Sequence, residues 1–147
     1  MASRFKFTLQ KVLDYRVQLE EQARLELAKA QNVFSRQADL CQSIRDEISR
    51  ILEESSREKR LDRDEMWLWR NYETRLREDL KKGETKLLEL ARILNQKRRE
   101  AVVRARDRKL LEKLKAKQAK RHEDERKLSE QREFDEMAAI RHSPWSI

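Results

Sequence analysis

The chain has 147 residues, of which 44% are charged, with a net charge of +8, a mean hydropathy of -1.06, one glycine and one proline. Because the turns of sheet proteins draw heavily on Gly, Pro, Asn and Asp, this composition excludes sandwiches, barrels and α/β folds. The single cysteine, Cys41, allows no internal disulfide and fits a reducing cytoplasm. No signal peptide is visible and no apolar run approaches the ~20 residues that span a bilayer, so we expect a soluble intracellular chain of long helices.

The first expected helix covers about residues 5–55. From Ala23 to Ile51 the apolar positions alternate steps of four and three, and Gln37 is the only polar member of this seam. A strict spacing of 3.5 residues predicts a coiled-coil helix, because it keeps one stripe facing a partner. Upstream of Ala23, an apolar face continues through Leu9 and Leu13 with looser phasing.

A polar stretch, E-E-S-S-R-E-K-R-L-D-R-D-E, follows the first seam and carries Leu61 as its only apolar residue. We expect a turn at about residues 56–63 within it. Asp62 followed by Glu65 predicts the N-cap and third position of a second helix, with the Asp62 side chain accepting a free backbone N–H.

The second expected helix covers about residues 64–141. Its seam runs from Trp69 to Leu94 and then weakens at Lys97, Arg104 and Arg108. Two stripes around a polar patch fit one unbroken rod or a hairpin, and we favour the hairpin because each stripe then buries the other. The predicted fold is all-α: one domain, 1–147, forming a long antiparallel two-helix coiled coil in which helix 2 is longer than helix 1.

The expected register pairs residues whose numbers sum to about 120, with its midpoint near Arg60 in the polar stretch. This register places Gln37 opposite Gly83 and brings the acidic residues 20–21 near the basic residues 98–99. A shift of one heptad stays open.

Charge is distributed unevenly along the second helix. Residues 81–121 have 16 Lys or Arg against 5 Asp or Glu, net +11, whereas residues 122–142 have 4 against 7, net -3. The basic stretch could bind nucleic acid through phosphate, but no base-reading fold accompanies it, so we favour contact with an acidic protein surface.

The end of the second helix, from about Lys120, should project beyond the first. Large apolar residues recur there at helical spacing and favour burial against a partner or a second copy, the alternative being a frayed tail. They are Leu128, Phe134, Met137 and Ile140.

Aromatic residues follow the expected turn. Trp69 and Tyr72 have the phase of the seam, whereas Trp67 lies off it, and an exposed Trp near a hairpin end is a frequent interface anchor.

Catalytic chemistry has little support in the sequence. His122 and His142 are far apart, and one glycine cannot form a glycine-rich phosphate loop. Two helices side by side also enclose no ligand-sized pocket. We therefore expect a protein that is not an enzyme and has no cofactor, no metal site and no small-molecule substrate.

The opening F-x-F-x-L-Q-x-V-L-x-x-R, at residues 5–16, resembles the N-terminus of the flagellar export family FliJ. The segment 113–140, ending in E-F-D-E-M-A, and the W-x-x-Y of Trp69 and Tyr72 are also similar to that family. The resemblance implies a cytoplasmic stalk of the flagellar type III export apparatus, peripheral to the inner membrane and similar to the stalk of rotary ATPases. Implied partners are the hexameric export ATPase FliI, its regulator FliH, the gate protein FlhA and export chaperones.

Combined with the charge pattern, the resemblance suggests two contact regions. The ATPase ring is expected to meet Phe5, Phe7, Leu9, Gln10, Leu13, Arg16, Arg104, Arg108, Lys115, Phe134 and Met137. The gate is expected to meet Trp67, Trp69 and Tyr72. The stalk of a virulence-type secretion system, a generic coiled-coil scaffold and a basic nucleic-acid-binding helix pair stay open as alternatives.

Overall fold

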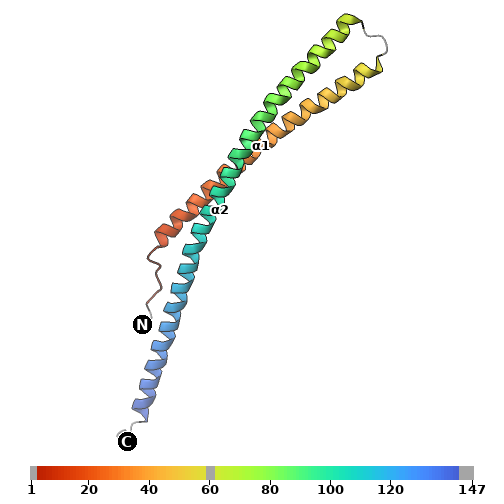
Figure 1. Cartoon of the computed structure of the whole chain (residues 1–147). Helices are drawn as coiled ribbons and strands as arrows, with labels where there is room; N and C mark the ends of the chain where they lie inside the picture. Colours follow the sequence, from red (N-terminus) through yellow and green to blue (C-terminus); the bar gives the residue numbers. More distant parts are fainter. Residues whose placement is uncertain (1–2, 59–61, 143–147) are drawn as a thin grey trace. The chain divides into compact units, whose positions relative to one another are not determined.

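The structure is a computed structural model that describes residues 3–58 and 62–142. These residues form two helices and no strand: α1 (Gln10–Arg57, 48 residues) and α2 (Arg63–Arg141, 79 residues), coloured red to yellow and green to blue in Figure 1. The helices pack against each other as a hairpin, and α2 is the longer. The all-α two-helix prediction is therefore confirmed. In the described part of the chain, neither helix has a stretch apolar enough to cross a membrane.

Helix α1 begins at Gln10, five residues after its expected start at about residue 5. The Gln10 amide donates to the Phe7 carbonyl at 3.1 Å, which closes a turn, and the first helical bond runs from the Leu13 amide to the Leu9 carbonyl at 2.9 Å. Phe5 and Phe7 alternate with polar residues, a period of two that suits extended backbone. The aromatic pair therefore precedes the helix.

Helix α2 begins at Arg63, directly after Asp62. The Arg63 amide donates to Asp62 Oδ1 at 2.8 Å, and the Met66 amide donates to the Asp62 carbonyl at 2.9 Å. The predicted N-cap is confirmed. The negative charges of Asp64 and Glu65 in the first turn interact favourably with the positive N-terminal end of the helix dipole. The expected midpoint Arg60 and the proline Pro144 lie outside the described residues.

Contacts within the chain form two compact units. Among the residues that the structure describes, unit 1 comprises 3–20 and 103–142, and unit 2 comprises 21–58 and 62–102. Each unit contains part of α1 and part of α2. The sequence itself predicts a single domain, 1–147.

Unit 2 is built on the predicted seam. Cys41 is fully buried, and Ile51 and Leu94 are only 1% and 4% exposed. The Gln37 side chain is buried and donates from Nε2 to the Gly83 carbonyl at 3.0 Å, so the predicted pairing of these two residues is confirmed.

Gly83 allows this close approach because it has no side chain. A Cβ at Gly83 would lie 3.1 Å from Cys41 Sγ and 3.4 Å from Gln37 Nε2. The first distance is tighter than ordinary carbon–sulfur contact. Absence of a side chain at this layer therefore makes room for both the thiol and the buried amide.

Unit 1 has a core that includes the segment preceding α1. Phe7, Leu13 and Leu111 are buried together, and Phe5 and Val17 pack against them. The non-helical N-terminal segment thus supplies aromatic rings to a face of α2 that a longer α1 would otherwise have covered.

The sequence predicts that residues 20–21 lie near residues 98–99, and for Glu20 this prediction is wrong. Glu20 is buried and accepts hydrogen bonds from the guanidinium of Arg108 instead. Both residues continue the four-three spacing of their own seams. Because both occupy seam positions, the charges meet between the helices rather than across the outer faces.

Candidate partner-binding surfaces

The N-terminal residues expected to contact a partner divide into buried and exposed sets. Phe7 and Leu13 are 7% and 5% exposed, so they hold unit 1 together rather than present a surface. Leu9 is exposed, and Gln10 donates from Nε2 to Asp14 Oδ1 at 2.9 Å on the surface of α1.

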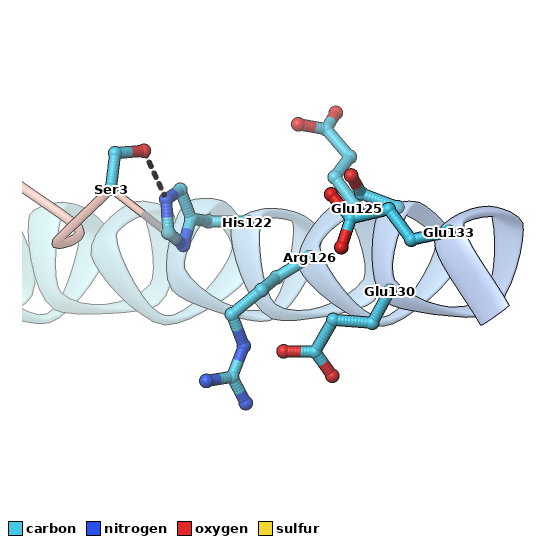
Figure 2. Close-up of a pocket in the computed structure, with 7 residues that line it drawn as sticks. Ser3, His122, Glu125, Arg126, Glu130 and Glu133 are labelled. Carbon is cyan, nitrogen blue, oxygen red and sulfur yellow. Dashed lines mark hydrogen bonds between the residues drawn. The ribbon is translucent and has the colours of Figure 1, made fainter. Parts of the chain in front are cut away.

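The N-terminal segment is also attached to α2 further along, at His122. The rings of Phe5 and His122 lie 5.7 Å apart between centroids with 52° between their planes. Ser3 Oγ lies 3.4 Å from His122 Nε2, the dashed line in Figure 2. Beyond His122, Arg126, Glu130 and other polar side chains line a hollow of about 380 Å³.

A second hollow, of about 310 Å³, lies between the helices of unit 1. We call it the unit 1 groove; it is lined by Val12, Tyr15, Arg16, Leu19, Arg104 and Asp107. The Arg16 guanidinium donates from Nη1 to the Asp107 carbonyl at 3.0 Å and so links α1 to α2 at the groove. Val12 is 41% exposed and Tyr15 is 60% exposed, which leaves apolar surface open beside two arginines.

Arg108 is predicted from the sequence as a contact residue, but its guanidinium is engaged within unit 1. Its guanidinium binds the buried Glu20 and donates from Nη1 to Glu112 Oε2 at 2.7 Å. The hydrogen bond to Glu20, followed by that to Glu112, raises the pKa of Arg108 above its ordinary value. Its charge is neutralised within unit 1 and serves to hold the helices together.

The other two basic contact residues differ in exposure. Arg104 is exposed at the unit 1 groove, whereas Lys115 is half-buried. Around them, residues 103–121 have nine Lys or Arg against two Asp or Glu. The groove therefore lies in a strongly basic stretch.

Every residue from Asp124 to the end of α2 at Arg141 is exposed, as is His142, the last described residue. Phe134 and Met137, both expected at a partner, are 71% and 60% exposed, and Ile140 is 70% exposed. Large apolar side chains left in water at helical spacing indicate an interaction face.

At the hairpin end of unit 2, Trp67 is 64% exposed, Tyr72 is 45% exposed and Trp69 is half-buried. Tyr72 Oη donates to Glu47 Oε1 at 3.3 Å, which links α2 to α1 near this end. A hollow of about 380 Å³ beside them is lined by Arg50, Glu54, Glu65, Leu68, Trp69 and Tyr72. The structure thus brings Trp69 and Tyr72 to one hollow and leaves Trp67 outside its lining.

Three apolar residues that line these hollows are not among the contact residues predicted from the sequence. Val12 and Leu19 precede the seam residues Leu13 and Glu20 by one position, and Leu68 precedes Trp69 in the same way. Positions beside a seam flank the partner helix, so apolar residues there could have marked both hollows.

A comparison with protein-family models matches residues 5–144 to the family described as Flagellar FliJ protein. The match covers nearly the whole chain and includes the opening motif. Searches of curated proteins and of solved structures returned no match.

Proposed function

The chain belongs to the FliJ family, components of flagellar export, and from this premise we propose that it is a non-catalytic stalk that couples the export ATPase to the export gate. Mechanical coupling needs a protein that contacts two partners through separate surfaces. The described residues offer two such surfaces, one in each unit.

Unit 1 is the proposed contact for the FliI ATPase ring. The observation that carries this assignment is the unit 1 groove, where exposed Val12 and Tyr15 lie beside Arg104 in a basic stretch. Apolar anchors surrounded by like charges suit a partner loop that has an apolar tip and acidic flanks.

The hairpin end of unit 2 is the proposed contact for the gate protein FlhA. An exposed Trp is the side chain most often found at the energetic centre of an interface, because it buries a large area with few rotatable bonds. Trp67 meets that description, and the neighbouring hollow offers room for a partner side chain.

We also propose that the chain binds the regulator FliH and the export chaperones, the remaining partners that the family implies. The place of action would be the cytoplasmic side of the inner membrane at the flagellar base, where the chain would be held by its partners.

Pull-down with the purified ATPase tests the first contact. Arg104→Glu should reduce binding about tenfold or more, since it reverses a charge at the groove. Arg106→Glu is the matched control, because Arg106 is exposed in the same basic stretch of α2 but does not line the groove and lies about 200° round the helix from Arg104. Arg108→Glu is unsuitable, because it would place two carboxylates together at Glu20. Equal loss from Arg104→Glu and Arg106→Glu would contradict the assignment.

Binding to the cytoplasmic part of FlhA tests the second contact. Trp67→Ala should weaken it strongly, while Leu88→Ala, which truncates a 74% exposed residue elsewhere in unit 2, should not. If Trp67→Ala instead removes ATPase binding and leaves FlhA binding intact, the two ends have been assigned in the wrong order.

A further inference from the structure

The hollow at the hairpin end of unit 2 has an aromatic wall that comes from one face of α2. Leu68, Trp69 and Tyr72 line it together with Glu65. At about 100° per residue these four positions fall within a sector of about 100°. Trp69 is half-buried, and Leu68 and Tyr72 are 60% and 45% exposed, so a side chain from outside can reach this wall.

The other wall comes from α1, and its charges are already paired. Arg50 donates from Nε to Glu47 Oε2 at 3.0 Å and from Nη1 to Glu54 Oε1 at 3.0 Å. Tyr72 Oη also donates to Glu47. Two carboxylates therefore share one guanidinium, which leaves this wall with a net charge of -1.

Glu65 adds a second negative charge that has no partner. Within the described part of the chain, its carboxylate makes no hydrogen bond or ion pair. The whole hairpin end, residues 47–73, has eight Asp or Glu against six Lys or Arg, a net charge of -2 in a chain whose net charge is +8. The hollow is therefore an aromatic and acidic site on a basic molecule.

The charge of Glu65 restricts what can fill the hollow. An apolar side chain would bury this carboxylate without a donor, and burial of an unpaired charge is costly. A lysine brings one compact and strongly hydrated charge, whereas an arginine brings a planar guanidinium that stacks on aromatic rings and pairs with a carboxylate through two N–H groups. Arginine is therefore the side chain that satisfies both the rings and the free carboxylate.

We propose that this hollow binds an arginine side chain of a protein partner, with the guanidinium stacked on Trp69 and paired with Glu65. The inference rests on the proposed function only in naming the gate protein as the source of that arginine. Trp67 lies about 160° round the helix from Trp69 and does not line the hollow, so the arginine contact is separate from the contact proposed for Trp67.

Nuclear magnetic resonance titration of the full chain with two short peptides tests the site without any partner protein. Acetyl-Leu-Arg-Leu amide and acetyl-Leu-citrulline-Leu amide have the same length and nearly the same shape, but only the first has a positive side chain. The arginine peptide should shift the indole N–H resonance of Trp69 more than that of Trp67, with a dissociation constant about fivefold below that of the citrulline peptide. Raising the salt from about 0.05 M to 0.5 M should reduce this difference, because the ion pair is screened.

Glu65→Gln should raise the dissociation constant of the arginine peptide about threefold or more, since it removes the charge and keeps the shape. Asp64→Asn is the matched control, because Asp64 is exposed in the same first turn of α2 but does not line the hollow. This variant should bind the arginine peptide as the unmodified chain does.

Three outcomes would overturn the inference: no shift of the Trp69 resonance, equal affinity for the two peptides, or equal weakening by Glu65→Gln and Asp64→Asn. Binding to the cytoplasmic part of FlhA separates the inference from the proposed function. If the arginine peptide binds as expected but FlhA does not bind the unmodified chain, the arginine site stands and the gate assignment fails. If Trp67→Ala removes FlhA binding while the two peptides behave alike, the gate contact stands and the arginine site fails.

Discussion

Unit 2 is held together by seam residues from both helices, with Cys41, Ile51 and Leu94 buried between them. Unit 1 instead buries a non-helical segment, with Phe7 in its core, and places the ion pair of Glu20 and Arg108 where unit 2 has apolar layers. Large apolar side chains stay exposed in both units, and in unit 1 they include residues at the groove and at the end of α2. The difference teaches that the two cores are built differently: unit 2 relies on the seam alone, whereas unit 1 also needs the segment that precedes α1.

The largest effect on this comparison should come from Leu111→Ala. Leu111 is buried beside Phe7 and Leu13, so its truncation should cost about 2–5 kcal/mol of stability. Hydrogen exchange should speed up in residues 10–20 and 103–120, while amides near Cys41 keep their protection. The neighbouring Leu110→Ala is the control, because Leu110 is 57% exposed. Equal loss in both variants would show that unit 1 does not depend on this core.

Removing half of the ion pair should have the next largest effect. Glu20→Gln leaves the Arg108 guanidinium without its buried carboxylate and should lower the melting temperature clearly. Glu20→Leu combined with Arg108→Leu should recover most of the loss, since apolar pairs fill a seam position without a desolvation cost. A double variant less stable than Glu20→Gln would mean that the ion pair stabilises unit 1 beyond what an apolar layer provides.

Much of the fold can be predicted from the sequence, because the spacing of the apolar residues in each seam shows which face of that helix contacts the other helix. Regular spacing from Ala23 to Ile51 is enough to predict α1 and the Gln37–Gly83 pairing, and the Asp62 cap follows from local chemistry. Hydrophobic periodicity says nothing about charged residues in seam positions. For that reason Glu20 and Arg108 were assigned to the wrong neighbours or to the surface.

The start of α1 shows a related limit. The F-x-F spacing is typical of extended backbone, but it directly precedes a helical pattern. The sequence therefore predicts a helix from about residue 5 that includes both phenylalanines, whereas α1 begins at Gln10. The groove between α1 and α2 depends on residues beside the seam, whose exposure is set by the partner helix rather than by their own spacing. Only the packed hairpin shows which of those residues stay open.

A smaller effect is expected at the glycine layer of unit 2. Gly83→Ala gains about 1 kcal/mol of helix propensity but forces a Cβ against Cys41 Sγ, and overpacking of this kind costs about 1–3 kcal/mol. We expect a net loss of about 1 kcal/mol in chemical denaturation. Adding Cys41→Ala should relieve the clash, so the double variant should lose less than the sum of the single losses. Strict additivity would show that the thiol is not what opposes the methyl group.

The smallest effect should come from surface ion pairs in unit 2. The hydrogen bond from Arg50, and its charge, hold the pKa of Glu47 below its ordinary value of 4.5. Because the folded pKa lies below the unfolded one, this stabilisation is present above about pH 4.5 and is lost as the pH falls through the lower folded value. Glu47→Gln should therefore change thermal melting only slightly at neutral pH and should flatten its acid limb. A steeper acid limb would contradict this sign.

Cys41 carries the only thiol in the chain and is completely buried, so its chemical labelling can measure how often the hairpin opens. A thiol reagent can reach its sulfur only when α1 and α2 separate at the Gly83 layer, so at high reagent concentration the labelling rate becomes the opening rate of that layer. A bound partner that twists or clamps the helices would change this rate without touching Cys41. The labelling rate of Cys41 in the unmodified chain can therefore show whether a bound partner loosens or tightens the packing of α1 against α2.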